Sequence, residues 1–137
     1  MSRVDTGYTL STTTDLAFAD AATRVREELA TEGFGVLCEI DVQATLKAKL
    51  GVDREPYVIL GACNPQLARA ALDAEPELGT LLPCNVVVYE QGGETHISAI
   101  DAERMLSIVG NTQLGDTASE VRRRLSNVVQ RAAGIDA

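Results

Sequence analysis

The spacing of apolar positions in the first third of the chain predicts a strand followed by a helix. Residues 8–13 are rich in β-forming side chains with partial alternation, which is typical of a strand. Between 18 and 29 the apolar residues recur at helical spacing, and this predicts an amphipathic helix. We expect Asp15 to cap that helix, and Gly33 can adopt the left-handed conformation that ends it.

The middle of the chain alternates between apolar runs and short helical segments. The runs at 34–40 and 57–63 predict strands, and both faces of the first run are largely apolar, which favours an interior position in a sheet. Asp41 is placed to cap a short helix over 42–50. Asn64 is placed to cap another short helix directly after the second strand.

The last third predicts a hairpin and a long helix. Strands are predicted at 81–90 and 95–100, and the two glycines between them permit the positive φ of a tight turn. Asp101 is placed to cap a short helical turn. Residues 117–120 match a capping box, so we expect the final helix to begin there and to end at Gly134.

These elements predict an α+β fold. The sheet would have five mostly antiparallel strands with the two long helices on one face, in the order β-α-β(4)-α with short helical connections. The hairpin requires at least one antiparallel pair. A doubly wound parallel sheet is the alternative, but the predicted helices at 42–50 and 66–74 are short for its crossovers.

Length and composition favour a single domain over 1–137. A chain of 137 residues buries enough surface for a core without disulfides or metals, and nothing resembling a linker or repeat divides it. We expect a core over about 8–132 and loose ends at 1–6 and 135–137. The chain has no tryptophan, so aliphatic side chains must supply most of the core.

The net charge of −8 argues against binding to nucleic acid, because such binding needs clustered cations. No uncharged apolar run approaches the length of a membrane span, and the first residues do not resemble a signal peptide. The number of cysteines is odd, so they cannot all pair within the chain. We therefore expect a cytoplasmic protein with reduced thiols and no membrane partner.

Two Cys-Asn pairs, each next to a proline, mark a candidate binding site. Cys63-Asn64 follows one predicted strand and Cys84-Asn85 opens the next. If these strands are neighbours in an antiparallel meander, the end of the first lies beside the start of the second. The sequence therefore predicts that both thiols approach one edge of the sheet.

Three chemistries fit the paired thiols. The leading hypothesis is binding of a small molecule, or of a soft metal ion such as Cu(I) held by Cys63 and Cys84. The second is a thiol-redox protein or enzyme in which the start of a helix lowers the pKa of Cys63. Against both stands the common role of free cysteine, including Cys38, as a small buried hydrophobe. No cofactor is required by the sequence.

Glu39 and His96 are the remaining candidates. Glu39 lies in an otherwise apolar strand, so it is either partly buried and suited to proton transfer or exposed near the strand end. His96 is the only histidine and is expected on the surface near the hairpin. A zinc site of the three cysteines and His96 is conceivable, but the chain has no Cys-x-x-Cys pair to begin it.

Several segments resemble the domain-of-unknown-function family 302. The similarity runs from about position 8 to 132, with distinct motifs in order at 33–41, 60–65, 75–86 and 98–101, followed by Met105. The resemblance implies a β-α-β(4)-α fold similar to that of TATA-box-binding proteins, and a homodimer. It implies no activity, and the negative charge argues against carrying over DNA binding.

A homodimer opens a further hypothesis for function. The domain would then be chiefly an assembly module, with its uncovered sheet face buried against a second copy.

Overall fold

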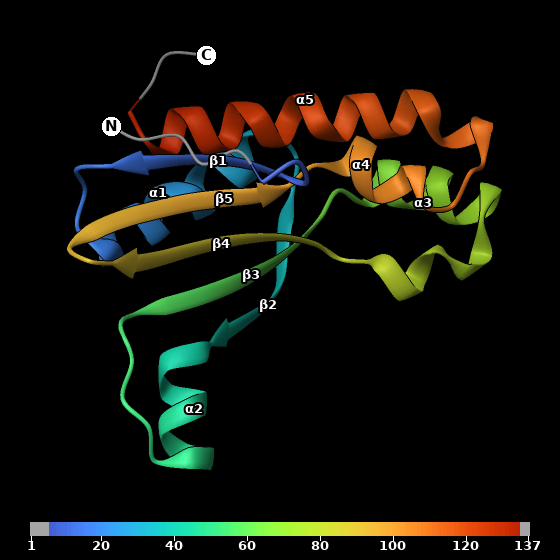
Figure 1. The fold of residues 1–137 in the computed structure, drawn as a ribbon. Helices are drawn as coiled ribbons and strands as arrows, with labels where there is room; N and C mark the ends of the chain where they lie inside the picture. The colour runs from blue at the N-terminus through green and yellow to red at the C-terminus, as the bar shows by residue number, and fades with distance from the viewer. Residues whose placement is uncertain (1–5, 135–137) are drawn as a thin grey trace.

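The computed structural model describes residues 6–134 and contains one antiparallel sheet, with the long helices α1 and α5 packed on one face and α2 projecting away from the other helices (Figure 1). In chain order the elements are β1 (Thr9–Thr14), α1 (Phe18–Thr31), β2 (Gly35–Asp41), α2 (Val42–Leu50), β3 (Tyr57–Cys63), α3 (Pro65–Ala74), η1 (Pro76–Leu81), β4 (Cys84–Gln91), β5 (Glu94–Ile100), α4 (Ala102–Ser107), η2 (Thr112–Leu114) and α5 (Gly115–Ala132). The loose ends predicted at 1–6 and 135–137 lie outside the described residues, except for Thr6.

The strands lie in the order β1-β5-β4-β3-β2, and every neighbouring pair is antiparallel. The predicted α+β fold with five strands is therefore confirmed, and the parallel alternative is wrong. Consecutive strands from β2 to β5 form a meander, and β1 closes the far side by pairing with β5. The predicted turn of the β4–β5 hairpin contains Gly92 and Gly93, both with positive φ.

The core fills the space between the sheet and the two long helices. Val25 and Leu29 of α1 and Leu125 and Val128 of α5 are fully buried against the sheet. The sheet contributes alternate residues from each inner strand, such as Leu60 of β3. Both long helices therefore cover the same face, as the apolar spacing predicts.

Two predicted helix starts are wrong. The N-cap of α1 is Ala17 rather than Asp15, and no side chain caps it. Helix α5 begins at Gly115, before the expected capping box, and it also lacks a side-chain cap. Glu120 does not reach back to the backbone because its carboxylate accepts hydrogen bonds from two of the three arginines that follow it, Arg123 and Arg124. An available cation offers this carboxylate a stronger partner than a backbone N–H group.

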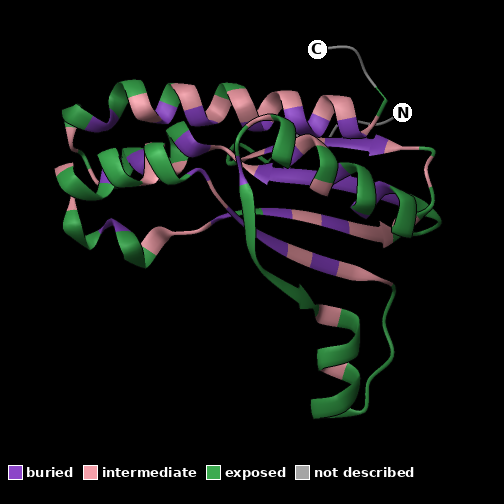
Figure 2. Ribbon diagram, turned by 180° about the vertical axis from the view of Figure 1, so that it is seen from behind, coloured by how far each residue is buried: buried purple, intermediate pink, exposed green. Residues whose placement is uncertain are grey.

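The second strand is not interior, and this prediction is also wrong. Strand β2 lies at the edge of the sheet, and all seven of its residues are exposed. Helix α2 follows it, has no buried residue and projects beyond the sheet, so the exposed edge strand and the helix form a surface arm (Figure 2). We call residues 35–50 the β2–α2 arm.

Among the described residues, none of the helices is both long enough and apolar enough to cross a membrane.

Candidate functional site

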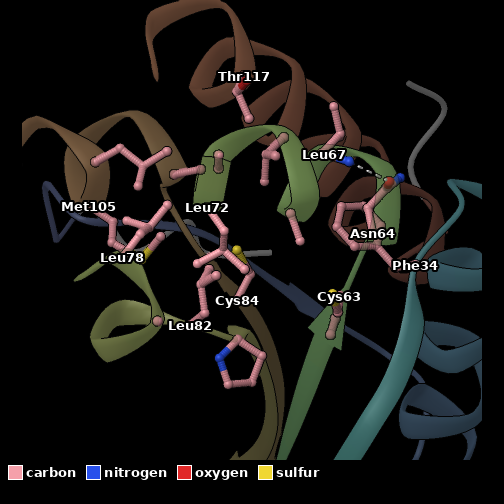
Figure 3. Close-up of a pocket in the computed structure, with 18 of the residues that line it drawn as sticks. Phe34, Cys63, Asn64, Leu67, Leu72, Leu78, Leu82, Cys84, Met105 and Thr117 are labelled. Atoms are coloured by element: carbon pink, nitrogen blue, oxygen red, sulfur yellow. Dashed lines mark hydrogen bonds between the residues drawn. The ribbon is translucent and has the colours of Figure 1, made fainter. Parts of the chain in front are cut away.

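An apolar pocket of about 330 Å³ lies at the end of the sheet where β3 finishes and β4 begins (Figure 3). Residues of α3, η1, α4 and α5 all contribute to its lining. It is lined by apolar or small side chains with two polar exceptions: Phe34, Leu37, Ala62, Cys63, Asn64, Leu67, Ala68, Ala71, Leu72, Leu78, Gly79, Leu82, Pro83, Cys84, Ala102, Met105, Leu106, Thr117 and Val121.

Strand register brings the two thiols to this pocket. Ala62 lies opposite Cys84 in the β3–β4 pair, so Cys63 ends its strand beside the residue that begins the next. Cys84 is buried and Cys63 is half-buried. Asn64 also lines the pocket, so three of the residues singled out in the sequence meet at one place.

Asn64 fixes the start of α3, which forms a wall of the pocket. Its side-chain Oδ1 accepts a hydrogen bond from the backbone N–H of Leu67 at 3.2 Å, and Pro65 occupies the first turn. This is the N-cap that the sequence predicts. The cap leads the chain from Cys63 into a helix whose Leu67 and Ala68 line the pocket.

Replacing Asn64 with alanine should lower the free energy of unfolding by about 1 kcal/mol, because one backbone N–H of α3 loses its partner. Asn64→Asp keeps an acceptor at the same position and should retain most of that stability. Urea denaturation of the three proteins measures the difference. Equal stability of Asn64→Ala and the wild type would contradict the capping role.

Burial raises the pKa of the Cys84 thiol to about 11, and the nearby Cys63 adds to the shift. Cys84 is therefore a neutral thiol near neutral pH. A thiolate is the form that attacks electrophiles and binds soft metals. Near neutral pH, the part of the pocket lining that Cys84 forms is therefore uncharged.

This shift predicts a pH dependence of stability. Because the pKa of Cys84 in the folded protein exceeds its ordinary value, its contribution is present below pH 9 and is lost as the pH rises toward 11. Comparing wild type with Cys84→Ala by thermal unfolding between these limits isolates the thiol. The stability difference should narrow with rising pH, and a constant difference would contradict the assignment. Alkylation of Cys84 should likewise stay slow until the pH approaches 11.

The pocket offers little polar chemistry. Among the described residues that line it, none carries a charge, and only Asn64 and Thr117 bear hydrogen-bonding side chains besides the thiols. The Asn64 Oδ1 already accepts the helix cap hydrogen bond. Such a surface suits a molecule that is mostly apolar and uncharged.

Two residues predicted for the site lie elsewhere. Asn85 is exposed and borders a separate hollow that contains Tyr57 and Tyr89. Glu39 is exposed on the β2 edge strand and forms an ion pair with Arg26 of α1. The exposed alternative therefore holds for Glu39. Neither side chain lines the pocket at Cys63.

His96 is buried rather than on the surface, so that expectation is wrong. Its ring stacks on Tyr89 with 4.7 Å between centroids, and Tyr89 stacks in turn on Tyr57 at 5.1 Å. Arg54 lies over the outer Tyr57 ring, 5.2 Å from its centroid. We call the three stacked rings the aromatic ladder. Burial raises the pKa of Tyr57 above its ordinary value.

The described residues provide no third ligand for a metal ion at Cys63 and Cys84. Over residues 6–134, no three side chains of His, Cys, Asp or Glu are grouped so that they could hold a metal ion. His96 belongs to the aromatic ladder, and Cys38 does not line the pocket. A zinc site of three cysteines and His96 is therefore not formed.

Sequence reasoning missed most of the pocket wall. Leu72, Leu78 and Met105 have the spacing of core residues, and the same spacing serves a wall that faces a cavity. The sequence feature that could have indicated a cavity is the small size of Ala68 and Ala71 on the inner side of α3. Small side chains on a helix that faces a sheet end leave space unless another element fills it.

Comparison with known proteins agrees with this architecture. The model of a family described as "Domain of unknown function DUF302" matches residues 10–132. The chain belongs to the DUF302 family. A solved structure, "Crystal structure of uncharacterized conserved protein DUF302 from Bacillus stearothermophilus", has a TM-score of 0.85 and 31% sequence identity. The match covers 90% of this chain and 97% of that chain.

Membership in the DUF302 family confirms the resemblance seen in the sequence motifs. No curated protein matches the chain. Neither the description of the family nor that of the solved structure names a ligand, reaction or partner. Function must therefore be argued from the pocket and the surface.

Proposed function

We propose that the pocket beside Cys63 and Cys84 binds a small, uncharged and largely apolar molecule. The observation that carries the proposal is a cavity of about 330 Å³ whose lining, over residues 6–134, contains no charged side chain. That volume lies within the range of small-molecule sites in proteins, roughly 300–1,000 Å³. A charged ligand would lose its hydration without gaining a partner.

A soft metal ion held by Cys63 and Cys84 is the alternative occupant, and the two thiols at one pocket are what support it. The raised pKa of Cys84 weighs against it, because the neutral thiol must first lose its proton. The same shift weighs against a redox couple, in which one thiolate attacks its partner sulfur.

A matched pair of substitutions in α3 tests apolar binding. Ala68 lines the pocket and is half-buried, whereas Ala70 is exposed on the same helix and does not line it. The uncharged fluorescent probe N-phenyl-1-naphthylamine should bind the wild type saturably. Ala68→Phe fills the cavity and should weaken binding by about tenfold or more, since each 1.4 kcal/mol of lost contact is a factor of ten. Ala70→Phe should bind as the wild type does.

The outcomes separate the candidates. Failure of the wild type to bind the probe, or equal binding by Ala68→Phe, would contradict the apolar site. Titration with Cu(I) under reducing conditions tests the alternative. Stoichiometric copper that Cys63→Ser and Cys84→Ser both abolish would replace the apolar proposal with a metal site.

Assembly as a homodimer is a second candidate role, and the exposed β2–α2 arm favours it. Edge strands with free backbone groups and apolar side chains are surfaces on which other chains add. Light scattering coupled to gel filtration tests this directly. A monomer across the micromolar range would contradict it.

A further inference from the structure

The β2–α2 arm leaves large apolar side chains in contact with water. Leu37 in β2 is 68% exposed and Leu50 at the end of α2 is 69% exposed. No residue of α2 is fully buried, and only Val42 and Leu46 are half-buried, so the helix is mostly uncovered in its own copy (Figure 2). A short helix gains most of its stability from packing, so an isolated one needs a surface to cover.

Leu37 also belongs to the pocket. It lies where the β2–β3 register shifts between Val36 and Cys38, and it lines the cavity while remaining exposed. Leu72 of α3 is the other lining residue that is both large and exposed. The pocket is therefore bordered by uncovered apolar side chains next to the free edge of β2.

We propose that two copies of the chain pair antiparallel through their β2 edges, and that α2 of each copy covers the pocket mouth of the other. The proposal rests on the apolar binding site described above and assigns its missing wall to a second copy. Pairing about a two-fold axis uses the same surface on both copies.

The direction of β2 places the partner's helix at the right end of the sheet. Gly35 begins β2 opposite Cys63, so the pocket lies at the starting end of this strand. In an antiparallel pair the end of one strand lies beside the start of the other. The partner's β2 therefore ends beside Gly35, and the partner's α2 continues past it toward Leu37 and Leu72.

The charges on the two surfaces are complementary. Lys47 and Lys49 are the only lysines of the chain, and α2 carries no acidic residue. Asp73, Glu75 and Glu77 follow one another closely where α3 passes into η1, beside the pocket. Two copies that each carry a net charge of −8 repel at long range, and this contact sets cations against carboxylates.

Pairing also accounts for the pattern of β2. Both faces of this strand are largely apolar, as in an interior strand, yet it lies at the sheet edge. Joined across the two-fold axis, the two sheets become continuous and β2 becomes interior. Covering the mouth then couples ligand binding to pairing, and each process strengthens the other by the same factor.

Carbodiimide cross-linking of the native protein tests the contact. The reagent joins a lysine to a carboxylate in direct contact, and a mixture of normal and ¹⁵N-labelled chains identifies links between copies. We expect mixed-isotope peptides that join Lys47 or Lys49 to Asp73 or Glu77. The ion pair of Lys47 with Asp53, at 2.9 Å, supplies an internal control link within one chain. Links only within single chains, or links between copies at other sites, would overturn the proposal.

A matched pair of exposed apolar residues tests the effect on the pocket. Leu50 lies at the end of α2, far along the arm from its own pocket, and it does not line that pocket. Leu50→Glu should abolish pairing and weaken binding of N-phenyl-1-naphthylamine by about fivefold or more. Ile108, which is 77% exposed after α4, provides the control: Ile108→Glu should change neither quantity.

These results distinguish the two proposals. Probe binding by a monomeric wild type, or by Leu50→Glu with unchanged affinity, overturns the covering role and leaves the apolar site intact. A dimeric wild type that does not bind the probe contradicts the apolar site, and the cross-links then decide the pairing alone.

Discussion

Replacing Leu125 with alanine should lower the free energy of unfolding by about 3 kcal/mol. Leu125 lies in α5 and is fully buried between this helix and the sheet. Its loss removes apolar contact and leaves a cavity that the surrounding close-packed side chains fill only in part. Urea denaturation monitored by circular dichroism measures the change, with the slope of the transition as the test of two-state behaviour.

Ile108→Ala is the matched control for Leu125→Ala, because Ile108 is 77% exposed. Its effect should stay within about 0.5 kcal/mol. Similar effects at the two positions would show that the packing of α5 on the sheet is not what stabilises the fold.

Gly61→Ala should lower the free energy of unfolding by about 2 kcal/mol, although the change adds only one methyl group. A Cβ at this position would lie 2.6 Å from Sγ of Cys38 and 2.9 Å from Cγ of Pro83. Both distances are below 3.0 Å, so Cys38 and Pro83 would have to shift to make room for the added methyl group. The two crowding atoms belong to the side chains of Cys38 in β2 and Pro83 just before β4, so a shift of one side chain relieves only one of the contacts.

A double-mutant cycle separates the two contacts at Gly61. Cys38 is exposed, so Cys38→Ala alone should be nearly neutral. The variant Cys38→Ala/Gly61→Ala should recover part of the stability that Gly61→Ala loses, and the remainder reports the contact with Pro83. Full additivity of the two single changes would show that Cys38 does not crowd this position.

Elements marked by local periodicity were predicted well. Helix α1 and strands β3 and β4 lie close to their expected ranges, because each buries one continuous face and the spacing of its apolar residues records that face. Asn64 was identified as a cap because an acceptor directly before a proline-initiated helix has a local role. The start of α5 was predicted incorrectly, because Arg123 and Arg124 compete with the backbone for the carboxylate of Glu120.

Strand order could not be read from any one segment. The apolar faces of β2 are those of an interior strand, and only pairing with distant residues determines that it lies at the edge. His96 was misplaced for the same reason. Its burial depends on Tyr89, which lies opposite it in the β4–β5 ladder.

The candidate site was predicted in part. Cys63 and Cys84 were expected to converge because neighbouring strands of a meander meet end to start, and the register of Ala62 with Cys84 has this geometry. The wall formed by α3, α4 and α5 was not foreseen, because it depends on how three helices pack together. Asn85 next to Cys84 was expected in the site, but side chains alternate along a strand and Asn85 therefore belongs to the opposite face.

The aromatic ladder gives the protein a built-in spectroscopic reporter. With no tryptophan in the chain, tyrosines dominate its absorption near 280 nm, and two of the three, Tyr57 and Tyr89, have their rings stacked. Stacked chromophores couple their electronic transitions, so the near-ultraviolet dichroism follows their relative orientation. Tyr57 begins β3, which is the next element after the β2–α2 arm. A change in the packing of the arm should therefore alter the near-ultraviolet dichroism without any added label.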